Sequence, residues 1–464
     1  MPVPADDTSA VVHLVHLNDT EGAVADVWPR LVTALRTLRA QGRLDVLLHA
    51  GDVPLGAPSG EVAVRLMNRL GVDAVALGNH DLDDGVPAFA AQAARLRAPV
   101  LCANVSGLPA GCVRPYCLPR RRGLRIAVVG VTLGDLLDHM VARYTVGLTV
   151  RPPAEALNDL VPWLRRRADL VVVLSHCSYA SDVVLANQVA GISVIVGGHS
   201  HHLITTPVCA GDAWVVQAGA SGAYVGWLAA RREGRLTVSG GVVPTAQLQP
   251  DARTLAECAS VRILSPIVGY TAVTLTSPTY ARETALGNLT ADVMRAAAGT
   301  DLALLRCGTV NISFPAGPIH HDDLRMLNFC GADQVARLRL TGAEIRAILE
   351  HGARSEYFLL TTSGARVAYD ATRLKGQRVV TIEVGSESLW ATREYTVACS
   401  EVLAHGVSGF PCLRDKPREL VPHTIVDLLT RHIVAHSPIQ PRIDGRLTIY
   451  GELPGEALGK PDAS

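Results

Sequence analysis

Residues 73–81 read DAVALGNHD, a short apolar run that ends in the polar residues Asn79, His80 and Asp81. Four other runs share this design: VVHLVHLND (11–19), DVLLHAGD (45–52), DLVVVLSH (169–176) and ISVIVGGHSH (192–201). Near-continuous runs of Val, Leu and Ile are typical of strands that are covered on both faces. In α/β folds, functional sites lie at the carboxyl ends of such strands. The five runs therefore predict a layered α/β domain with its site at a sheet edge.

Helix-like segments lie between these runs. Residues 26–41 and 59–71 carry apolar residues at helical spacing, and the second segment ends at Gly71, as a glycine-capped helix does. The alternation is interrupted around Pro250, and a second mixed segment follows from about Val268. We therefore expect two domains, at 11–250 and 265–450, followed by a disordered tail.

Length and composition limit the class of function. With 464 residues the chain is about three times the size expected for one domain. Lys and Arg total 43, Asp and Glu also total 43, and no long basic run occurs, which argues against a nucleic-acid polymer or an anionic membrane as partner. The apolar runs are too short to span a bilayer. A small-molecule partner is expected.

The first residues, MPVPADDTSA, lack the positive and apolar regions of a secretory signal, so the expected location is the cytoplasm. The ten cysteines include no CxxC pair, which favours reduced thiols over a structural zinc site.

The strand ends gather carboxylates, an amide and imidazoles, namely Asp19, Glu21, Asp52, Asn79, His80, Asp81, His176, His199 and His201. Most of these motifs, taken alone, are more typical of a turn or a surface group than of a ligand, but five in succession favour a site. Mixed oxygen and nitrogen ligands suit Mn, Fe, Zn or Co better than Ca. A pair of ions needs a bridging carboxylate, and Asp52 directly after a strand suits that role.

These motifs also carry a family resemblance. LNDTEG, HAGD, LGNHD, LSH and GGHSHH resemble the five blocks of calcineurin-like metallophosphoesterases. MNRLGVDAVALGNHDLDDG and the following LCANV narrow the resemblance to the 5'-nucleotidase branch. Later segments resemble that branch's carboxy-terminal substrate-binding domain: ETALGNLTADVMR, AGPIHHDDL, LRLTGAEIRAILE, AYD (368–370), REYTVACSEVLAHG and RIDGRL. The fold implied is a β-sandwich flanked by helices, followed by a mixed α/β domain.

The resemblance implies two divalent ions, drawn from Mn, Fe, Zn, Co and Mg. One would be held by Asp19, Asp52 and His201, and the other by Asp52, Asn79, His176 and His199. The implied catalytic pair is His80, facing the phosphoryl group, and Asp81, holding the His80 ring. Water activated by the two metals would attack phosphorus in line.

Two segments depart from the family pattern. The family's Asp-x-His block reads Asp19-Thr20-Glu21, so a carboxylate replaces an imidazole; Glu21 is either a harder ligand, which favours Mn or Fe over Zn, or a turn residue. The family's Asn-x-Gly-x-x-Arg segment aligns with Arg306 to Asn311, with Asn and Arg at opposite ends. The substrate-binding residues that the resemblance implies are Asn104, Arg306, Asn311, Phe358 and Phe410, with Phe358 equally suited to a core position.

The sequence thus predicts a two-domain phosphoester hydrolase that releases phosphate from nucleoside monophosphates. The alternatives are a 2',3'-cyclic-nucleotide phosphodiesterase, a nucleotide-sugar pyrophosphatase, a phosphatase of a non-nucleotide ester, and a degenerate homologue that binds nucleotides without turnover.

Overall fold

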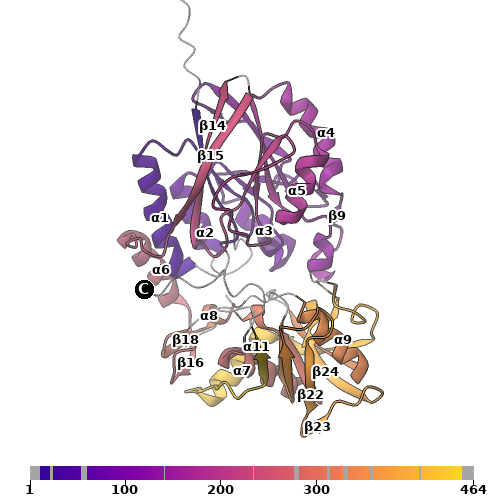
Figure 1. Ribbon diagram of the computed structural model, residues 1–464. Coiled ribbons are helices and arrows are strands. Elements are labelled where there is room, and N and C mark those ends of the chain that lie inside the picture. Colours follow the sequence, from indigo (N-terminus) through magenta and orange to yellow (C-terminus); the bar gives the residue numbers. More distant parts are fainter. Residues whose placement is uncertain are drawn as a thin grey trace, which may run out of the picture. The chain divides into compact units, whose positions relative to one another are not determined.

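The computed structural model of the chain describes residues 11–20, 24–53, 60–140, 142–233, 235–275, 282–310, 314–325, 327, 333–354, 359–406 and 409–451. The backbone divides into two compact units, Met1–Ile263 and Leu264–Ser464 (Figure 1). The division falls near the end of helix α6 (Ala252–Leu264), somewhat after the boundary expected near residue 250.

Two sheets form the centre of the first unit. Their main strands are β1 (Val11–Leu17), β2 (Val46–His49), β3 (Ala74–Ala76), β4 (Val100–Leu101), β6 (Tyr116–Cys117), β8 (Leu124–Thr132), β10 (Leu170–His176), β11 (Val194–Gly197), β12 (Val208–Ala210), β13 (Ala213–Val216), β14 (Tyr224–Glu233) and β15 (Arg235–Pro244). The strand orders are β15-β14-β1-β2-β3-β4 and β12-β13-β11-β10-β8-β6. Strands β1 to β4 are parallel, as are β8, β10, β11 and β13. Parallel neighbours bring their carboxyl ends to one edge of each sheet.

Helices cover the outer face of each sheet in the first unit. Trp28 of α1 (Val24–Ala40) and Leu66 of α2 (Gly60–Leu70) belong to the core cluster on one sheet. Leu157 of α4 (Pro153–Arg165) and Leu185 of α5 (Tyr179–Gln188) belong to the cluster on the other. A third cluster fills the space between the sheets, because alternate strand residues point to opposite faces. This layering is the helix-flanked β-sandwich that the sequence predicted.

The second unit is mixed α/β, also as predicted. Its elements are β16 (Ile267–Thr271), α7 (Ala285–Ala298), β17 (Leu302–Arg306), β18 (Gly317–His320), α8 (His321–Arg325), β19 (Gln334–Thr341), α9 (Gly342–Gly352), β20 (Leu360–Ser363), β21 (Ala365–Asp370), β22 (Val379–Val384), β23 (Glu387–Ser388), β24 (Glu394–Ser400), α10 (Glu401–Ala404), β25 (Arg418–Thr424), α11 (Ile425–His436) and β26 (Leu447–Tyr450). The strands form a five-stranded sheet, β20-β17-β24-β19-β25, a four-stranded sheet, β23-β22-β21-β26, and a two-stranded sheet, β16-β18. No helix in the described part of the chain is long and apolar enough to cross a membrane.

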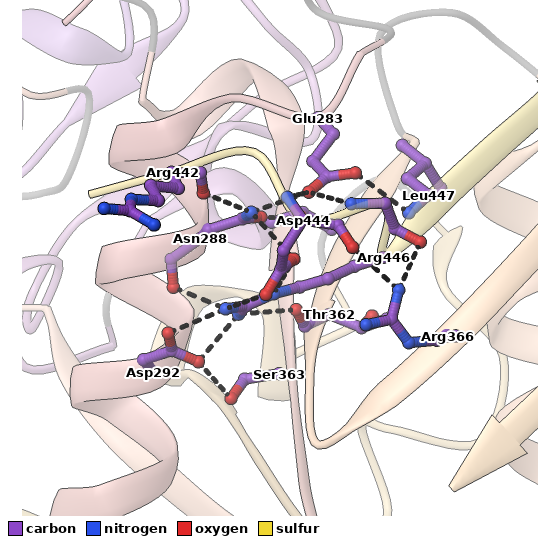
Figure 2. A network of polar contacts seen from close by, with 12 residues as sticks. Glu283, Asn288, Asp292, Thr362, Ser363, Arg366, Arg442, Asp444, Arg446 and Leu447 are labelled. Carbon is purple, nitrogen blue, oxygen red and sulfur yellow. Dashed lines mark hydrogen bonds and ion pairs between the residues drawn. The ribbon is translucent and has the colours of Figure 1, made fainter. Parts of the chain in front are cut away.

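A polar network connects residues 442–447 to α7 and to Glu283 just before it (Figure 2). The Arg446 guanidinium donates two hydrogen bonds to the Asp292 carboxylate, at 2.7 and 2.8 Å, and others to Asp444. The Glu283 carboxylate accepts hydrogen bonds from Asn288 and from the Leu447 backbone nitrogen. The segments 283–295 and 442–447 are far apart in sequence, but these hydrogen bonds hold them together next to β26.

Candidate metal centre

Five strand ends supply the polar residues of the candidate site. Asp19 follows β1, Asp52 follows β2, and Asn79 follows β3; all three strands are neighbours in one sheet. In the other sheet, His176 is the last residue of β10, and His199 follows the neighbouring β11. The parallel register explains why residues up to 180 positions apart meet, as when the His199 backbone nitrogen donates to Asp19 Oδ1 at 2.9 Å.

Asp52 and two histidines form the centre of this group. One ligand atom from each of Asp52, His176 and His199 lies within 4.8 Å of the others. His176 Nε2 is 3.0 Å from Asp52 Oδ2, while its Nδ1 faces the Ala50 carbonyl oxygen at 2.8 Å. His199 Nδ1 is 3.1 Å from Asn79 Oδ1. Asp52, Asn79, His176 and His199 are therefore brought together as the sequence predicted.

Asp19 and His201 lie beside this cluster. Asp19 Oδ1 is 3.7 Å from His201 Nε2 and 3.9 Å from His176 Nε2. Asn18 donates to Asp19 Oδ2 at 2.7 Å, which orients the carboxylate. Glu21, the remaining candidate ligand, lies outside the described residues.

Glycines allow the candidate ligands to approach the backbone closely. A Cβ atom on Gly51 would lie 2.5 Å from His176 Nδ1, and one on Gly198 would lie 2.6 Å from the Ala50 carbonyl oxygen. A Cβ on Gly78 would collide with the Asp52 carboxylate. A side chain at Gly51 or Gly198 would displace His176, and one at Gly78 would displace Asp52. Only glycine therefore fits at these three positions.

The backbone is strained at four of the candidate ligands. Asp19, Asp52, His199 and His201 have φ angles of 49°, 55°, 71° and 56°. This left-handed region is uncommon for residues other than glycine, and each instance costs of the order of 1–3 kcal/mol unless its surroundings enforce it. Several residues with strained backbone close together are typical of a functional site.

Buried polar side chains support the turns that carry the histidines. The Ser175 hydroxyl, adjacent to His176, donates a hydrogen bond to the fully buried Asp182 carboxyl. Ser200, between His199 and His201 in sequence, donates to Gln217 Oε1 at 3.3 Å and accepts from the Tyr179 backbone nitrogen at 2.9 Å.

The partner of the His80 ring corrects the sequence prediction. His80 Nδ1 is 2.8 Å from Asp83 Oδ2, whereas Asp81 accepts a hydrogen bond from the Gly78 backbone nitrogen at 2.8 Å. Residues 80–82 form the 3-10 helix η1 (His80–Leu82), and a 3-10 turn brings residue i+3 back beside residue i. The spacing His-x-x-Asp was the signal for Asp83, and the sequence analysis missed it.

The ionisable groups of the cluster change one another's pKa values. Burial lowers the pKa of His176, but the neighbouring Asp52 carboxylate outweighs it, so the net pKa is well above the ordinary histidine value. Burial tends to raise the pKa of Asp52, but His176 and His80 reverse this and hold it low. Burial, with the nearby His176, lowers the pKa of His199 to about 3. Asp52 is therefore ionised and His199 neutral at pH 7, which are the ligand forms that a cation binds.

The donor set fits a divalent ion. His176 Nε2 is buried and makes no well-aligned hydrogen bond within the described residues, although it is 3.0 Å from Asp52 Oδ2. A cation between these two atoms would satisfy both, because carboxylate oxygen and neutral imidazole nitrogen are its preferred donors.

The structure gives Asn104 a structural role. Asn104 is 2% exposed, and its amide donates to the carbonyl oxygens of Thr132 and Arg151 at 2.8 and 3.2 Å. Its Oδ1 accepts from the Thr132 backbone nitrogen at 2.9 Å. Both amide protons and the oxygen are thus engaged with backbone, which favours a structural role, and contact of Asn104 with substrate stays a prediction.

Phe410 also differs from expectation. It is 4% exposed and packs in a core cluster of the second unit, with its ring centroid 4.7 Å from that of His351. This burial in the core cluster does not favour a stacking role, and the assignment of Phe410 as a stacking residue stays a prediction. Arg306 ends β17 and is partly exposed; Asn311 and Phe358 lie outside the described residues.

Comparison with known proteins places each unit in a family. Residues 12–203 match the calcineurin-like phosphoesterases, and residues 267–415 match the 5'-nucleotidase C-terminal domain. The chain is therefore a calcineurin-like phosphoesterase joined to a 5'-nucleotidase C-terminal domain, which confirms the resemblance seen in the sequence. It is a metallophosphatase-type phosphoester hydrolase. Calcineurin-like phosphoesterases use a dinuclear divalent metal centre, and the Asp52 cluster is the candidate for it here.

Individual proteins are similar over most of the chain. A snake venom 5'-nucleotidase of Naja atra is 25% identical, covering 92% of this chain and 93% of its own. The 5'-nucleotidase of Mus musculus is 26% identical, with 90% and 84% covered. In three dimensions, a 5'-nucleotidase precursor from Thermus thermophilus superposes with a TM-score of 0.78 and 27% identity, covering 95% of this chain and 100% of that one.

Proposed function

We propose that this protein binds two divalent ions and hydrolyses nucleoside monophosphates to nucleoside and inorganic phosphate. The proposal rests on the Asp52 cluster, whose three ligand atoms lie within 4.8 Å of one another at the carboxyl ends of parallel strands in two sheets. The substrate class is inferred from relatives named 5'-nucleotidase. These relatives match this chain over most of their own length.

In this proposal Asp52 is shared by both ions. Asp19 and His201 complete one site, and Asn79, His176 and His199 complete the other. The 3.0 Å approach of His176 to Asp52 and the 3.1 Å approach of His199 to Asn79 support the second set. The 3.7 Å separation of Asp19 and His201 supports the first. Divalent ions there supply positive charge to the phosphoryl oxygens and lower the pKa of water.

His80 is the catalytic side chain of the proposal. Its backbone nitrogen donates to Asp52 Oδ1 at 2.9 Å, which fixes its place next to the cluster. The Asp83 carboxylate can only accept, so it holds a proton on His80 Nδ1 and fixes the tautomer. We assign Nε2 to the phosphoryl oxygens or the leaving group, where it stabilises the developing charge. The bond that breaks joins phosphorus to the ester oxygen.

A second candidate is a phosphomonoesterase without base selectivity. Phe410 is packed in the core and Asn104 is bound to backbone, so these two of the five side chains expected at a nucleotide give no support for base recognition. Stacking on an aromatic ring contributes roughly 1–3 kcal/mol per base, and without it discrimination among bases is weak.

A substrate panel tests both candidates. Chelator-treated protein is supplied with Mn, Fe, Zn, Co or Mg, and phosphate release is measured on four nucleoside monophosphates, a sugar phosphate and p-nitrophenyl phosphate. The proposal predicts metal-dependent release with the highest kcat/KM on nucleotides. Equal efficiency on the phosphates without a base would favour the second candidate. No release from any of these esters would indicate a binding homologue, a cyclic-nucleotide phosphodiesterase or a pyrophosphatase.

A further inference from the structure

His139 contacts a candidate metal ligand although no motif includes it. It is the last residue of the 3-10 helix η2 (Leu136–His139), which follows the carboxyl end of β8. Its ring centroid is 5.6 Å from that of His199, with the two planes at 82°. The His176 ring contacts His199 as well, at 5.3 Å and 67°.

The orientation of the His199 ring decides whether it can bind an ion. Its Nδ1 is 3.1 Å from Asn79 Oδ1, so the proposed ion would bind between these atoms. Rotation of the ring about its Cβ–Cγ bond would replace Nδ1 by a carbon atom. Edge-to-face packing of aromatic rings is worth roughly 0.5–1.5 kcal/mol beyond the buried area, and it favours one orientation. Contacts from His139 and His176 therefore restrict this rotation.

His139 is itself held by Asp135. His139 Nε2 is 3.2 Å from Asp135 Oδ2, four residues earlier in the chain. The His139 side chain is 18% exposed, whereas that of Asp135 is 61% exposed. A polar contact this exposed is worth roughly 0–1 kcal/mol, so the ring contact should matter more than Asp135.

We propose that His139 is a positioning residue that keeps Nδ1 of His199 directed at the metal ion shared with Asn79, with Asp135 as its weaker support. The inference rests on the proposed function in one respect, that His199 binds metal. His139 acts through an edge-to-face ring contact and not through a hydrogen bond to His199, so its contribution to metal affinity is the modest one of such a contact.

The test measures Mn²⁺ affinity by chelator competition, with bound metal counted per chain. His139→Ala should weaken one of the two sites by roughly 2–10-fold, the affinity equivalent of the lost ring contact, and leave the other unchanged. His139→Phe, which keeps an aromatic ring and removes both nitrogens, should restore most of that loss. Asp135→Asn should change the affinity by less than about fivefold.

His13→Ala is the matched control. His13 is also partly exposed and also faces an aspartate, Asp45, at 3.3 Å, but it lies at the start of β1, away from the strand carboxyl ends. This variant should bind both ions as the wild type does. Thermal unfolding of the metal-free variants checks the fold, and His139→Leu, which fills the space without a ring, replaces His139→Ala if the latter unfolds.

Two results would overturn the inference: wild-type affinity at both sites in the variant without a ring, or equal losses in His139→Ala and His139→Phe. The second result would show that a His139 nitrogen is needed, which is a different role. Failure of the wild type to bind two ions would instead overturn the proposed function.

Discussion

The Asp83 carboxylate lies 2.8 Å from Nδ1 of His80, three residues earlier, across the single turn of η1. The same turn places the His80 backbone nitrogen on Asp52 Oδ1. One short 3-10 turn therefore joins an imidazole, the carboxylate that orients it, and the carboxylate at the centre of the candidate metal cluster.

The first prediction concerns Asp83. Asp83→Asn should lower kcat by roughly 10–100-fold, because an amide no longer fixes one protonation state of the His80 ring. Metal content should stay at the wild-type level, since Asp83 is not among the proposed ligands. Asp84→Asn, which removes the same charge one residue later, is the control and should keep its activity. Normal turnover in Asp83→Asn would show that the contact is only structural.

His80 gives the second prediction. His80→Ala should reduce kcat by about 10²-fold or more, the scale for a positioned acid, base or charge-stabilising group. Elemental analysis should find the wild-type amount of metal. A variant that loses an ion would reveal His80 as a ligand and refute the role given to it above.

The third prediction is a pH dependence of metal binding. The neighbouring Asp52 raises the pKa of His176 in the metal-free protein, so His176 carries a proton at pH 7 that a cation must displace. Affinity should therefore rise with pH, by up to about tenfold per unit below that pKa, with proton release detectable by calorimetry in buffers of different ionisation enthalpy. The free energy of unfolding of the metal-free protein should change in the opposite direction. The His176–Asp52 pair contributes fully to it below the ordinary histidine pKa, and this contribution is lost as pH rises through the raised pKa of His176. Affinity independent of pH from 6 to 9 would contradict this assignment.

Arg446 provides a prediction for the second unit. Arg446→Ala should lower the free energy of unfolding by roughly 1–3 kcal/mol, because it removes charge-assisted hydrogen bonds to Asp292 and Asp444. Arg366→Ala, which removes hydrogen bonds to two exposed backbone carbonyls, should cost less. Urea denaturation measures both. Equal effects would mean that the bidentate pair in Figure 2 adds no particular stability.

Much of the fold and of the candidate metal cluster could be predicted because strand ends are local features of the sequence. Polar residues after five buried strands predicted Asp52, Asn79, His176 and His199 at one edge, and the parallel topology places them there. These predictions needed only the strand pattern and the rule for parallel sheets.

Other features depend on packing, which the sequence does not display. Nothing around Phe410 indicates whether the ring is packed or open, and its contact with His351 comes from α9, about 60 positions earlier. His139 lies outside every motif, and its contact with His199 also spans 60 positions. Asp83 could be predicted as the partner of His80 only if residues 80–82 were already known to form a turn.

A manganese titration of chelator-treated protein tests the central claim most directly, with bound metal and phosphate release from adenosine monophosphate measured in the same samples. The account predicts two ions per chain and release that appears as the second ion binds. Asp52→Asn, folded in its metal-free form, should lose at least one ion and most of the release. Full release without metal, or two ions and normal release in Asp52→Asn, would contradict a dinuclear centre built on Asp52.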